Sequence, residues 1–524
     1  MGMKPTHGFN GVARLLPGVR KIVFWPSFLL LMVAVLFSFI DVERFLAVMT
    51  NINQWILSNF DGLFSYSTLS LLITLLIVYC SPLGLVTIGG QKAQPLLTKW
   101  RWFSITLCTT LATGILFWAA AEPMYHLYSP PESLDLIAGS VTAQEFTMAT
   151  LFMHWSFSPY AIYCVPSLVF ALCYYNLNSS FTIGSTLAPA IGKSAVALGG
   201  NIIDSIALFA LVAGMASSLG TGILSLSGGI EATMGIANGK LLMAVVAAVI
   251  VLTFVVSAIS GLQKGIARLS NVNAQVFVAL CLFVLVFGPT EFILANGVSG
   301  LLEYGGSFLE RSTNTLTGPN DEWPRAWTVF YFANWYAWAP IAALFLGRIA
   351  KGYTVRQFIN VNLIFPACFA ILWMSVFAGA AIHYDALLEG AFRQSLLKNG
   401  PESVIYMLFD NLPLASFMTI ALIGMIFISF VTAADSNTDA MSRLCTQSDR
   451  VKKESNRTSI KLKLIWGMTI GVIAWVMVSF ASIDGIRLLT SLGGLPALFI
   501  IMLANLSLIL LIKRAVQGAD FEPD

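Results

Sequence analysis

Residues 327–340 read Trp-Thr-Val-Phe-Tyr-Phe-Ala-Asn-Trp-Tyr-Ala-Trp-Ala-Pro and lie inside a longer apolar run, 327–347. Seven of the first twelve residues are aromatic, against 12% of the whole chain. A run of about 20 apolar residues crosses a bilayer as one helix. Lipid needs no such density of rings, whereas rings around a cavity attract a cation, with about 0.5–2 kcal/mol for each desolvated face. The stretch therefore predicts a membrane helix with a candidate onium-binding face.

The composition of the whole chain agrees with a membrane protein. Its 524 residues are 57% hydrophobic and 10% charged, and the mean hydropathy is +0.80. Soluble domains carry about 25% charged residues, so a soluble fold of this size could not cover its surface. An all-α membrane protein with many spans is predicted. The net charge of +3 is small for the size and argues against a nucleic-acid partner.

Twelve apolar runs are long enough to cross the bilayer. They are 22–40, 64–85, 102–121, 146–175, 202–230, 241–260, 270–290, 327–347, 359–382, 416–434, 464–483 and 492–512. With the N-terminus inside, 22 of the 29 Lys and Arg residues fall in inside segments and 7 in outside loops. Because cytoplasmic loops are enriched in these residues, both termini are predicted to be cytoplasmic.

The sequence carries no pattern typical of an enzyme. None of the seven cysteines forms a CxxC pair, the four histidines form no HExxH, and no Walker motif occurs. We therefore expect no enzymatic activity, no metal centre and no cofactor. Many spans without catalytic motifs favour a secondary transporter, whose substrate site lies near the midplane at a broken helix.

A second aromatic cluster lies in the span 146–175. Trp155, Tyr160 and Tyr163 fall in the middle of the run, and Pro159 frees a backbone carbonyl beside them. On one continuous helix, Trp155 and Tyr163 would lie about 80° apart around the axis. Aromatic residues in spans more often serve packing or an interfacial belt. A belt belongs at the ends of a helix, which favours a site here.

The span 416–434 ends in hydroxyl-bearing residues. Ser429, Thr432 and Ser436 could offer oxygen ligands to a sodium ion at a helix break. The alternative is that these hydroxyls bond back to the preceding helical turn. Two acids near inner span ends, Asp204 and Asp435, are interpreted as side chains that snorkel to the membrane interface. Glu122, at the outer end of the third span, is interpreted as part of a helix terminus.

Several motifs together resemble the betaine/choline/carnitine transporter (BCCT) family, over nearly the whole chain. They are Phe117–Pro123 (FWAAAEP), the aromatic runs of the fourth and eighth spans, Gly261–Asn271 (GLQKGIARLSN) and Ala434-Asp435-Ser436. The resemblance implies the LeuT-type fold, with inverted five-helix repeats preceded by two extra helices, and a homotrimer. The implied division is a tail 1–21, two helices 22–101, a first repeat 102–290, an external loop 291–326 with a surface helix, a second repeat 327–512 and a tail 513–524.

The resemblance also implies the substrate site. An aromatic box of Trp155, Tyr160, Tyr163 and Trp335 would hold a trimethylammonium group, with Trp338 beside the path. The family more often has Trp at the positions of Tyr160 and Asn334. Its Gly-x-Gly-x-Gly segment is reduced here to residues 110–114 (TLATG), so Thr113 and Gly114 are expected to line a less open segment.

The implied sodium site is incomplete. In sodium-coupled members, span-three backbone, here at Leu111, and a Thr-Ser pair in span ten hold one ion. Thr432 matches the threonine, but Ala433 replaces the serine. Members that work without sodium place a basic side chain from span seven there, at the position we align to Ala274. Sodium is thus a candidate coupling ion, and we lean toward sodium independence.

We predict a transporter of a quaternary ammonium compound of the betaine, carnitine or choline type in a bacterial inner membrane, surrounded by lipid. Transport would proceed by alternating access, as symport or as exchange. One alternative is a transporter of a small zwitterion without a quaternary nitrogen, such as a sulfonate amino compound, which Asn334 and Tyr160 would suit. A membrane sensor that does not transport is an alternative of another class.

Overall fold

The computed structural model describes residues 18–110, 112–260, 263–446, 452–519 and 521–523, and helices make up nearly all of them. The predictions about Leu111 and about most of the tail 1–21 concern residues outside these ranges. The longer helices are α2 (Lys21–Ile40), α3 (Val42–Cys80), α4 (Lys99–Thr110), α5 (Ala112–Tyr128), α6 (Val141–Trp155), α7 (Phe157–Tyr175), α10 (Lys193–Met234), α11 (Lys240–Ser260), α12 (Gln263–Phe287), α13 (Thr290–Gly306), α15 (Phe330–Arg348), α17 (Phe365–Leu387), α20 (Ala415–Leu444) and α21 (Lys452–Val516).

Short helices connect these elements. They are η1 (Pro82–Leu85), η2 (Glu132–Leu134), α8 (Ile183–Thr186), α9 (Ala188–Ile191), α14 (Phe308–Ser312), α16 (Val355–Ile359), α18 (Ala391–Asn399), α19 (Glu402–Asp410) and the π-helical turns η3 (Arg325–Val329) and η4 (Asn360–Ile364). Two isolated β-bridges, Val19 with Thr446 and Thr87 with Thr354, are the extended pairings among the described residues. The expected all-α fold is confirmed.

Most of the predicted spans correspond to long apolar helices. Eight helices are long and apolar enough to cross a membrane, and three bent pairs bring the number to eleven. The last stretch, Thr458–Val516, has 59 residues and is interrupted at Ser482 (φ 47°, ψ −128°), near the end of the predicted span 464–483 and before the span 492–512. Since about 20 residues suffice for one crossing, this stretch is long enough for two.

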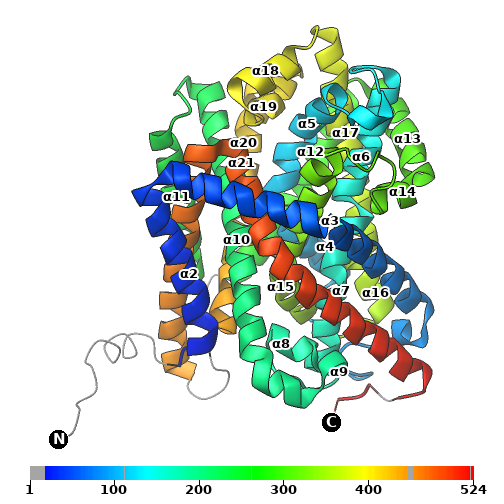
Figure 1. Ribbon diagram of the computed structural model, residues 1–524, viewed down its shortest axis with the longest axis vertical. Coiled ribbons are helices and arrows are strands. Elements are labelled where there is room, and N and C mark those ends of the chain that lie inside the picture. The colour runs from blue at the N-terminus through cyan, green and yellow to red at the C-terminus, as the bar shows by residue number, and fades with distance from the viewer. Residues whose placement is uncertain (1–17, 111, 261–262, 447–451, 520, 524) are drawn as a thin grey trace, which may run out of the picture.

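Some helix boundaries differ from the expected ones. Helix α3 begins at Val42 rather than residue 64, because the Asp41 side chain caps it by accepting a hydrogen bond from the Arg44 N–H. In Figure 1 this long helix runs obliquely across the front of the bundle. Helix α5 continues to Tyr128, so Glu122 lies inside a helix and is fully buried. The interpretation of Glu122 as part of a helix terminus is therefore wrong.

Two broken helices occupy matching places in the chain. The first helix of each predicted repeat is bent, by 54° between α4 and α5 and by 53° within Arg325–Arg348. Pro340 lies at the second bend, where its missing N–H and its ring disfavour a straight helix. In membrane transporters, interrupted helices at corresponding positions mark the substrate site. The space between these two bends is therefore the candidate site.

Segments predicted on the same side of the membrane meet at the same end of the bundle. At one end, the Arg20 N–H donates to the Cys445 carbonyl over 2.8 Å, and the Asn176 amide donates to the Phe521 carbonyl over 2.7 Å. At the other end, Arg325 pairs with Asp61 over 2.9 Å. These contacts agree with the alternation of inside and outside segments derived from Lys and Arg.

The two acids near inner span ends are buried rather than at an interface. Asp204 is 0% exposed; it pairs with Arg20 over 2.6 Å and accepts the Gly184 N–H over 2.9 Å. Asp435 is 3% exposed and accepts a hydrogen bond from Ser257 over 3.1 Å. The interpretation of these acids as snorkelling side chains is wrong, because tertiary contacts provide partners for them inside the protein.

Candidate functional site

The fourth predicted span is two helices, and the break determines where its rings point. Helix α6 ends at Trp155 and α7 begins at Phe157, with Ser156 between them in a non-helical conformation (φ −111°, ψ −119°). The Ser156 hydroxyl donates to the Phe152 carbonyl over 2.5 Å. Pro159 falls in the first turn of α7, where its missing N–H costs little. The angle expected between Trp155 and Tyr163 on one continuous helix therefore does not apply.

Four aromatic rings meet across α6, α7 and α15. The Trp335 ring centre lies 5.5 Å from that of Trp155, 5.2 Å from that of Tyr163 and 6.3 Å from that of Tyr160. The planes of Trp155 and Trp335 are nearly perpendicular, at 85°. All four side chains are buried, with at most 3% of each exposed. The sequence-predicted box residues are thus neighbours in space.

Three of these rings border a cavity of about 560 Å³ between the two bent helix pairs. Of the predicted site residues, Trp155, Tyr163, Trp335, Trp338, Asn334 and Gly114 line it. Tyr160 is not among the lining residues and packs behind Trp335, fully buried. The side chain of Thr113 and the whole of Leu111 lie outside the described residues.

Other lining residues were missed by sequence reasoning. They are Thr109, Trp118, Ser217, Ser218, Thr221, Phe330 and Ile486, whereas Thr110, from the segment 110–114 in which it was expected to offer a hydroxyl, also lines the cavity. Ser217, Ser218 and Thr221 come from α10, and a stretch rich in small residues, 213–229, was the available signal for close approach. The residues that line the cavity include aromatic faces, hydroxyls and one amide, and none of them carries a formal charge.

Both tryptophans of the box present ring faces rather than N–H groups. The Trp335 Nε1–H donates to the His154 carbonyl over 3.0 Å. The Trp155 Nε1–H donates to Oε2 of Glu122 over 2.7 Å. Neither N–H therefore points into the cavity, and the π-faces of such rings attract cations.

Glu122 is the centre of a buried polar cluster behind the box. Its Oε1 lies 2.7 Å from His154 Nδ1 and 3.0 Å from His126 Nε2, and its Oε2 also accepts from the Tyr331 hydroxyl over 2.5 Å. The ligand-type atoms of Glu122, His126 and His154 lie within 4.8 Å of one another, a spacing that could hold a metal ion. The hydrogen bonds among them satisfy the carboxylate without an ion. No sequence pattern had brought these three residues together.

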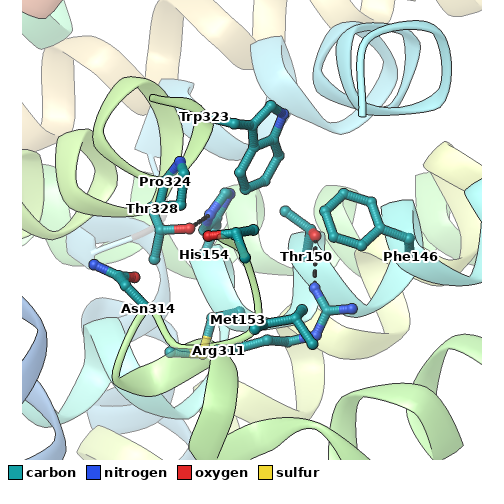
Figure 2. A pocket seen from close by; sticks show the side chains of 11 residues that line it. Phe146, Thr150, Met153, His154, Arg311, Asn314, Trp323, Pro324 and Thr328 are labelled. Atoms are coloured by element: carbon teal, nitrogen blue, oxygen red, sulfur yellow. Dashed lines mark hydrogen bonds between the residues drawn. The ribbon is translucent and has the colours of Figure 1, made fainter. Parts of the chain in front are cut away.

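A smaller chamber of about 310 Å³ is lined in part by His154, a member of this cluster (Figure 2). His154 reaches its wall, where Nε2 lies 3.1 Å from the Thr328 hydroxyl. Arg311 is 7% exposed there; it donates to Thr150 over 2.8 Å and packs over the Phe146 ring. Glu122 thus connects His154, which lines the chamber, with Trp155, which lines the aromatic cavity.

Thr432, a predicted sodium ligand, lies within α20 and bonds to its own helix. The Thr432 hydroxyl donates to the carbonyls of Ile428 and Ser429, over 2.9 and 3.0 Å, as side chains bonding back to the preceding turn do. Ala433 is 4% exposed beside it. The Asn273 amide from α12 donates to the Ser429 hydroxyl over 2.7 Å and lies 3.8 Å from Cys108 Sγ of α4. Asn273, the neighbour of Ala274, thus connects spans three, seven and ten.

These features define a class of protein. A multi-pass helical bundle with two matching bent helix pairs around an uncharged aromatic cavity is the architecture of a membrane solute transporter. A sequence model of the BCCT, betaine/carnitine/choline family transporters, matches residues 22–517. The chain belongs to this family and is a multi-pass membrane transporter, not an enzyme.

Similar proteins with curated names support the family. The chain is 26% identical to an ectoine/hydroxyectoine transporter of Virgibacillus pantothenticus, over 95% of this chain and 97% of the relative. It is 30% identical to the glycine betaine transporter OpuD of Bacillus subtilis (strain 168), over 93% of each chain. It is 26% identical to an osmo-dependent choline transporter, BetT2, of Acinetobacter baylyi, over 93% of this chain and 70% of the relative.

Among solved structures, one similar chain is a Na+-coupled sialic acid symporter in a substrate-bound, outward-open state. The TM-score is 0.48 and the sequence identity is 12%, over 84% of this chain and 86% of the other.

Proposed function

We propose that this protein transports a quaternary ammonium compound of the betaine, choline or carnitine type by alternating access. The supporting observation is the meeting of the Trp155, Tyr163 and Trp335 rings at an uncharged cavity. A quaternary ammonium group has no N–H to donate in a hydrogen bond, and π-faces bind it without a counter-charge. A carboxylate in the wall would also attract protons and metal ions, and no lining residue carries one.

The polar end of the substrate would meet the hydroxyls of α10 and the amide of Asn334. Ser217 and Thr221 lie one helical turn apart and both line the cavity, opposite residues of α15. Hydroxyl and amide groups donate hydrogen bonds to a carboxylate or accept one from an alcohol. This set suits glycine betaine and carnitine, and it also accommodates choline.

Sodium-independent transport, including exchange of one substrate molecule for another, is our mechanistic proposal. It rests on Ala433, which offers no hydroxyl beside Thr432, and on the Asn273 amide, which connects the spans that would surround a sodium ion. A neutral amide donor can hold these helices together by hydrogen bonds, where an ion would hold them by coordination.

A small zwitterion without a quaternary nitrogen is the second candidate. Asn334 lines the cavity as a polar side chain, and one similar protein is named an ectoine/hydroxyectoine transporter. We further expect a homotrimer in a bacterial inner membrane, with both termini in the cytoplasm, which native mass spectrometry and protease protection of inverted vesicles would test.

Uptake into proteoliposomes tests the function. Radiolabelled glycine betaine, choline, carnitine and ectoine are offered with and without a sodium gradient, and with and without unlabelled substrate inside. We expect uptake of at least one quaternary compound, stimulated by internal substrate and unchanged by sodium. Uptake of ectoine alone would favour the second candidate. Binding without any uptake, in either direction and under all gradients, would favour a sensor.

A further inference from the structure

The carboxylate of Glu122 lies directly behind the aromatic box without lining the cavity. It is 0% exposed and belongs to α5, whereas the Trp155 and Tyr331 side chains that donate hydrogen bonds to it belong to α6 and α15. Burying a carboxylate in an apolar bundle costs free energy, and intramembrane acids are functional candidates.

Hydrogen-bond geometry indicates the protonation state of this cluster. Both oxygens of Glu122 are occupied by donors: Oε1 by the two histidines and Oε2 by the Trp155 indole and the Tyr331 hydroxyl. An ionised carboxylate is an acceptor only and can take four such bonds, whereas a protonated one would need an acceptor in return.

The two histidines fit the neutral form. His154 donates from Nδ1 to Glu122, and its Nε2 lies 3.1 Å from the Thr328 hydroxyl, which can donate to it. His126 donates from Nε2, and its Nδ1 is buried without a hydrogen-bond partner among the described residues. A protonated imidazole would present a donor at both positions. With both imidazoles in this neutral form, the cluster as a whole carries one negative charge.

We propose that Glu122 is a positioning residue that orients Trp155 and Tyr331 and makes the box attractive to a cation, because its negative charge lies behind the Trp155 ring. The indole N–H bonded to a carboxylate transfers electron density to the ring, which strengthens the negative potential of its face. Trp335 differs in this respect, because its N–H is bonded to the neutral His154 carbonyl.

Arg487 is a cationic side chain near the cluster. Its guanidinium carbon lies 4.5 Å from the Trp327 ring centre, and the Trp327 ring lies 4.5 Å from that of His126. Aromatic and imidazole rings thus stand between Arg487 and Glu122. Arg487 also packs over Phe330, which lines the cavity, with 5.3 Å between the guanidinium carbon and the ring centre.

This inference rests on the proposed function and can be tested separately from it. The probes are choline and its neutral isostere 3,3-dimethyl-1-butanol, whose tert-butyl group has the shape of trimethylammonium without the charge. Binding to the full-length protein in detergent is measured by quenching of tryptophan fluorescence or by competition with labelled choline, for the wild type, Glu122→Gln and Glu122→Asp. Glu145→Gln is the matched control: its carboxylate accepts a bond from Ser299, and it lies outside the cavity lining.

We expect Glu122→Gln to weaken choline binding by about tenfold and the binding of the neutral isostere by less than about twofold. Glu122→Asp, which keeps the charge, is expected to retain most of the choline affinity, and Glu145→Gln to change neither ligand. Equal losses for choline and the isostere would show that Glu122 maintains shape only, and unchanged choline binding would show no role; either result overturns the inference.

A second comparison covers the case in which Glu122→Gln does not fold. Trp155→Phe and Trp335→Phe each keep a ring and remove one indole N–H, but only the first removes a bond to a carboxylate. For each variant, the loss of choline affinity is compared with the loss of isostere affinity. The inference requires this difference to be larger in Trp155→Phe than in Trp335→Phe, and equal differences contradict it. If the wild type binds none of choline, glycine betaine and carnitine, the proposed function itself fails.

Discussion

Gly114 lies against the ring of Trp155, so closely that a β-carbon at position 114 would come within 3.2 Å of Cη2 and 3.5 Å of Cζ3. Gly114 belongs to α5, next to the bend in the first helix pair, and Trp155 ends α6. The absence of a side chain at residue 114 allows the indole to occupy its place at the cavity. The position of a box ring thus depends on one glycine of another helix.

Substitution of this glycine is expected to disturb the box. In Gly114→Ala the new methyl group pushes the Trp155 ring by a few tenths of an ångström, and in Gly114→Val by more. We expect the apparent KM for the onium substrate to rise, of order tenfold for Val and less for Ala, because small misplacements at a site are costly. Gly424→Ala is the control, since a β-carbon there meets no atom within 4 Å. An unchanged KM in Gly114→Val would contradict the contact.

The two tryptophans of the eighth span are expected to differ in importance. Trp335 contacts three box rings, whereas Trp338 lines the cavity at a distance from them. Trp335→Ala should weaken onium binding by about tenfold or more, consistent with the loss of a desolvated cation–π face. Trp338→Ala should cost less than about threefold. Isothermal titration of the purified variants measures both affinities. Equal losses would show that Trp338 contributes as much to the onium site as Trp335.

Transport is expected to tolerate loss of the Thr432 hydroxyl. In Thr432→Val the bonds to the carbonyls of Ile428 and Ser429 disappear, at a cost of about 1 kcal/mol in stability. Exchange uptake in proteoliposomes should remain within about twofold of the wild type, with or without sodium. Asn273→Ala, which removes the link to Ser429, should slow exchange more strongly. A sodium-dependent rate that Thr432→Val abolishes would identify Thr432 as an ion ligand.

Stability should depend on pH through Glu402, which begins the short helix α19 in a segment predicted to lie outside the membrane. Burial raises the pKa of Glu402 to about 7, and its Oε2 has no hydrogen-bond partner among the described residues. In the unfolded chain this carboxyl titrates near about 4.3. Between these values the folded state binds more protons than the unfolded state, so stability falls as pH rises through this window.

Glu402→Gln should remove that dependence. At pH 8 we expect the variant to be more stable than the wild type by about 1–3 kcal/mol, and at pH 4.5 the difference should vanish. Thermal unfolding in detergent at the two pH values measures it, with exposed Glu132→Gln as the control. A variant less stable than the wild type at pH 8 would show that the charged form of Glu402 contributes favourably.

Particular residues show how far sequence reasoning extends to the site. The density of rings around Trp335 and the central position of Trp155 and Tyr163 indicated two candidate site segments, and the family resemblance implied that these residues are neighbours. The hydroxyls of α10 were missed because Ser217 and Thr221 lie in a stretch whose small residues are equally typical of helix packing. The break at Ser156 was also missed, since one continuous apolar run covers both helices.

The sequence by itself determined the membrane character, the approximate places of the long helices and the ring-rich segments. These depend on local composition, because every apolar run of sufficient length must satisfy its backbone groups as a helix in lipid. Only the tertiary structure decided that Glu122 faces His126, His154, Trp155 and Tyr331, and that Asp204 meets Arg20. Hydrogen bonds between residues far apart in the chain leave no periodic pattern, since they depend on how the helices pack.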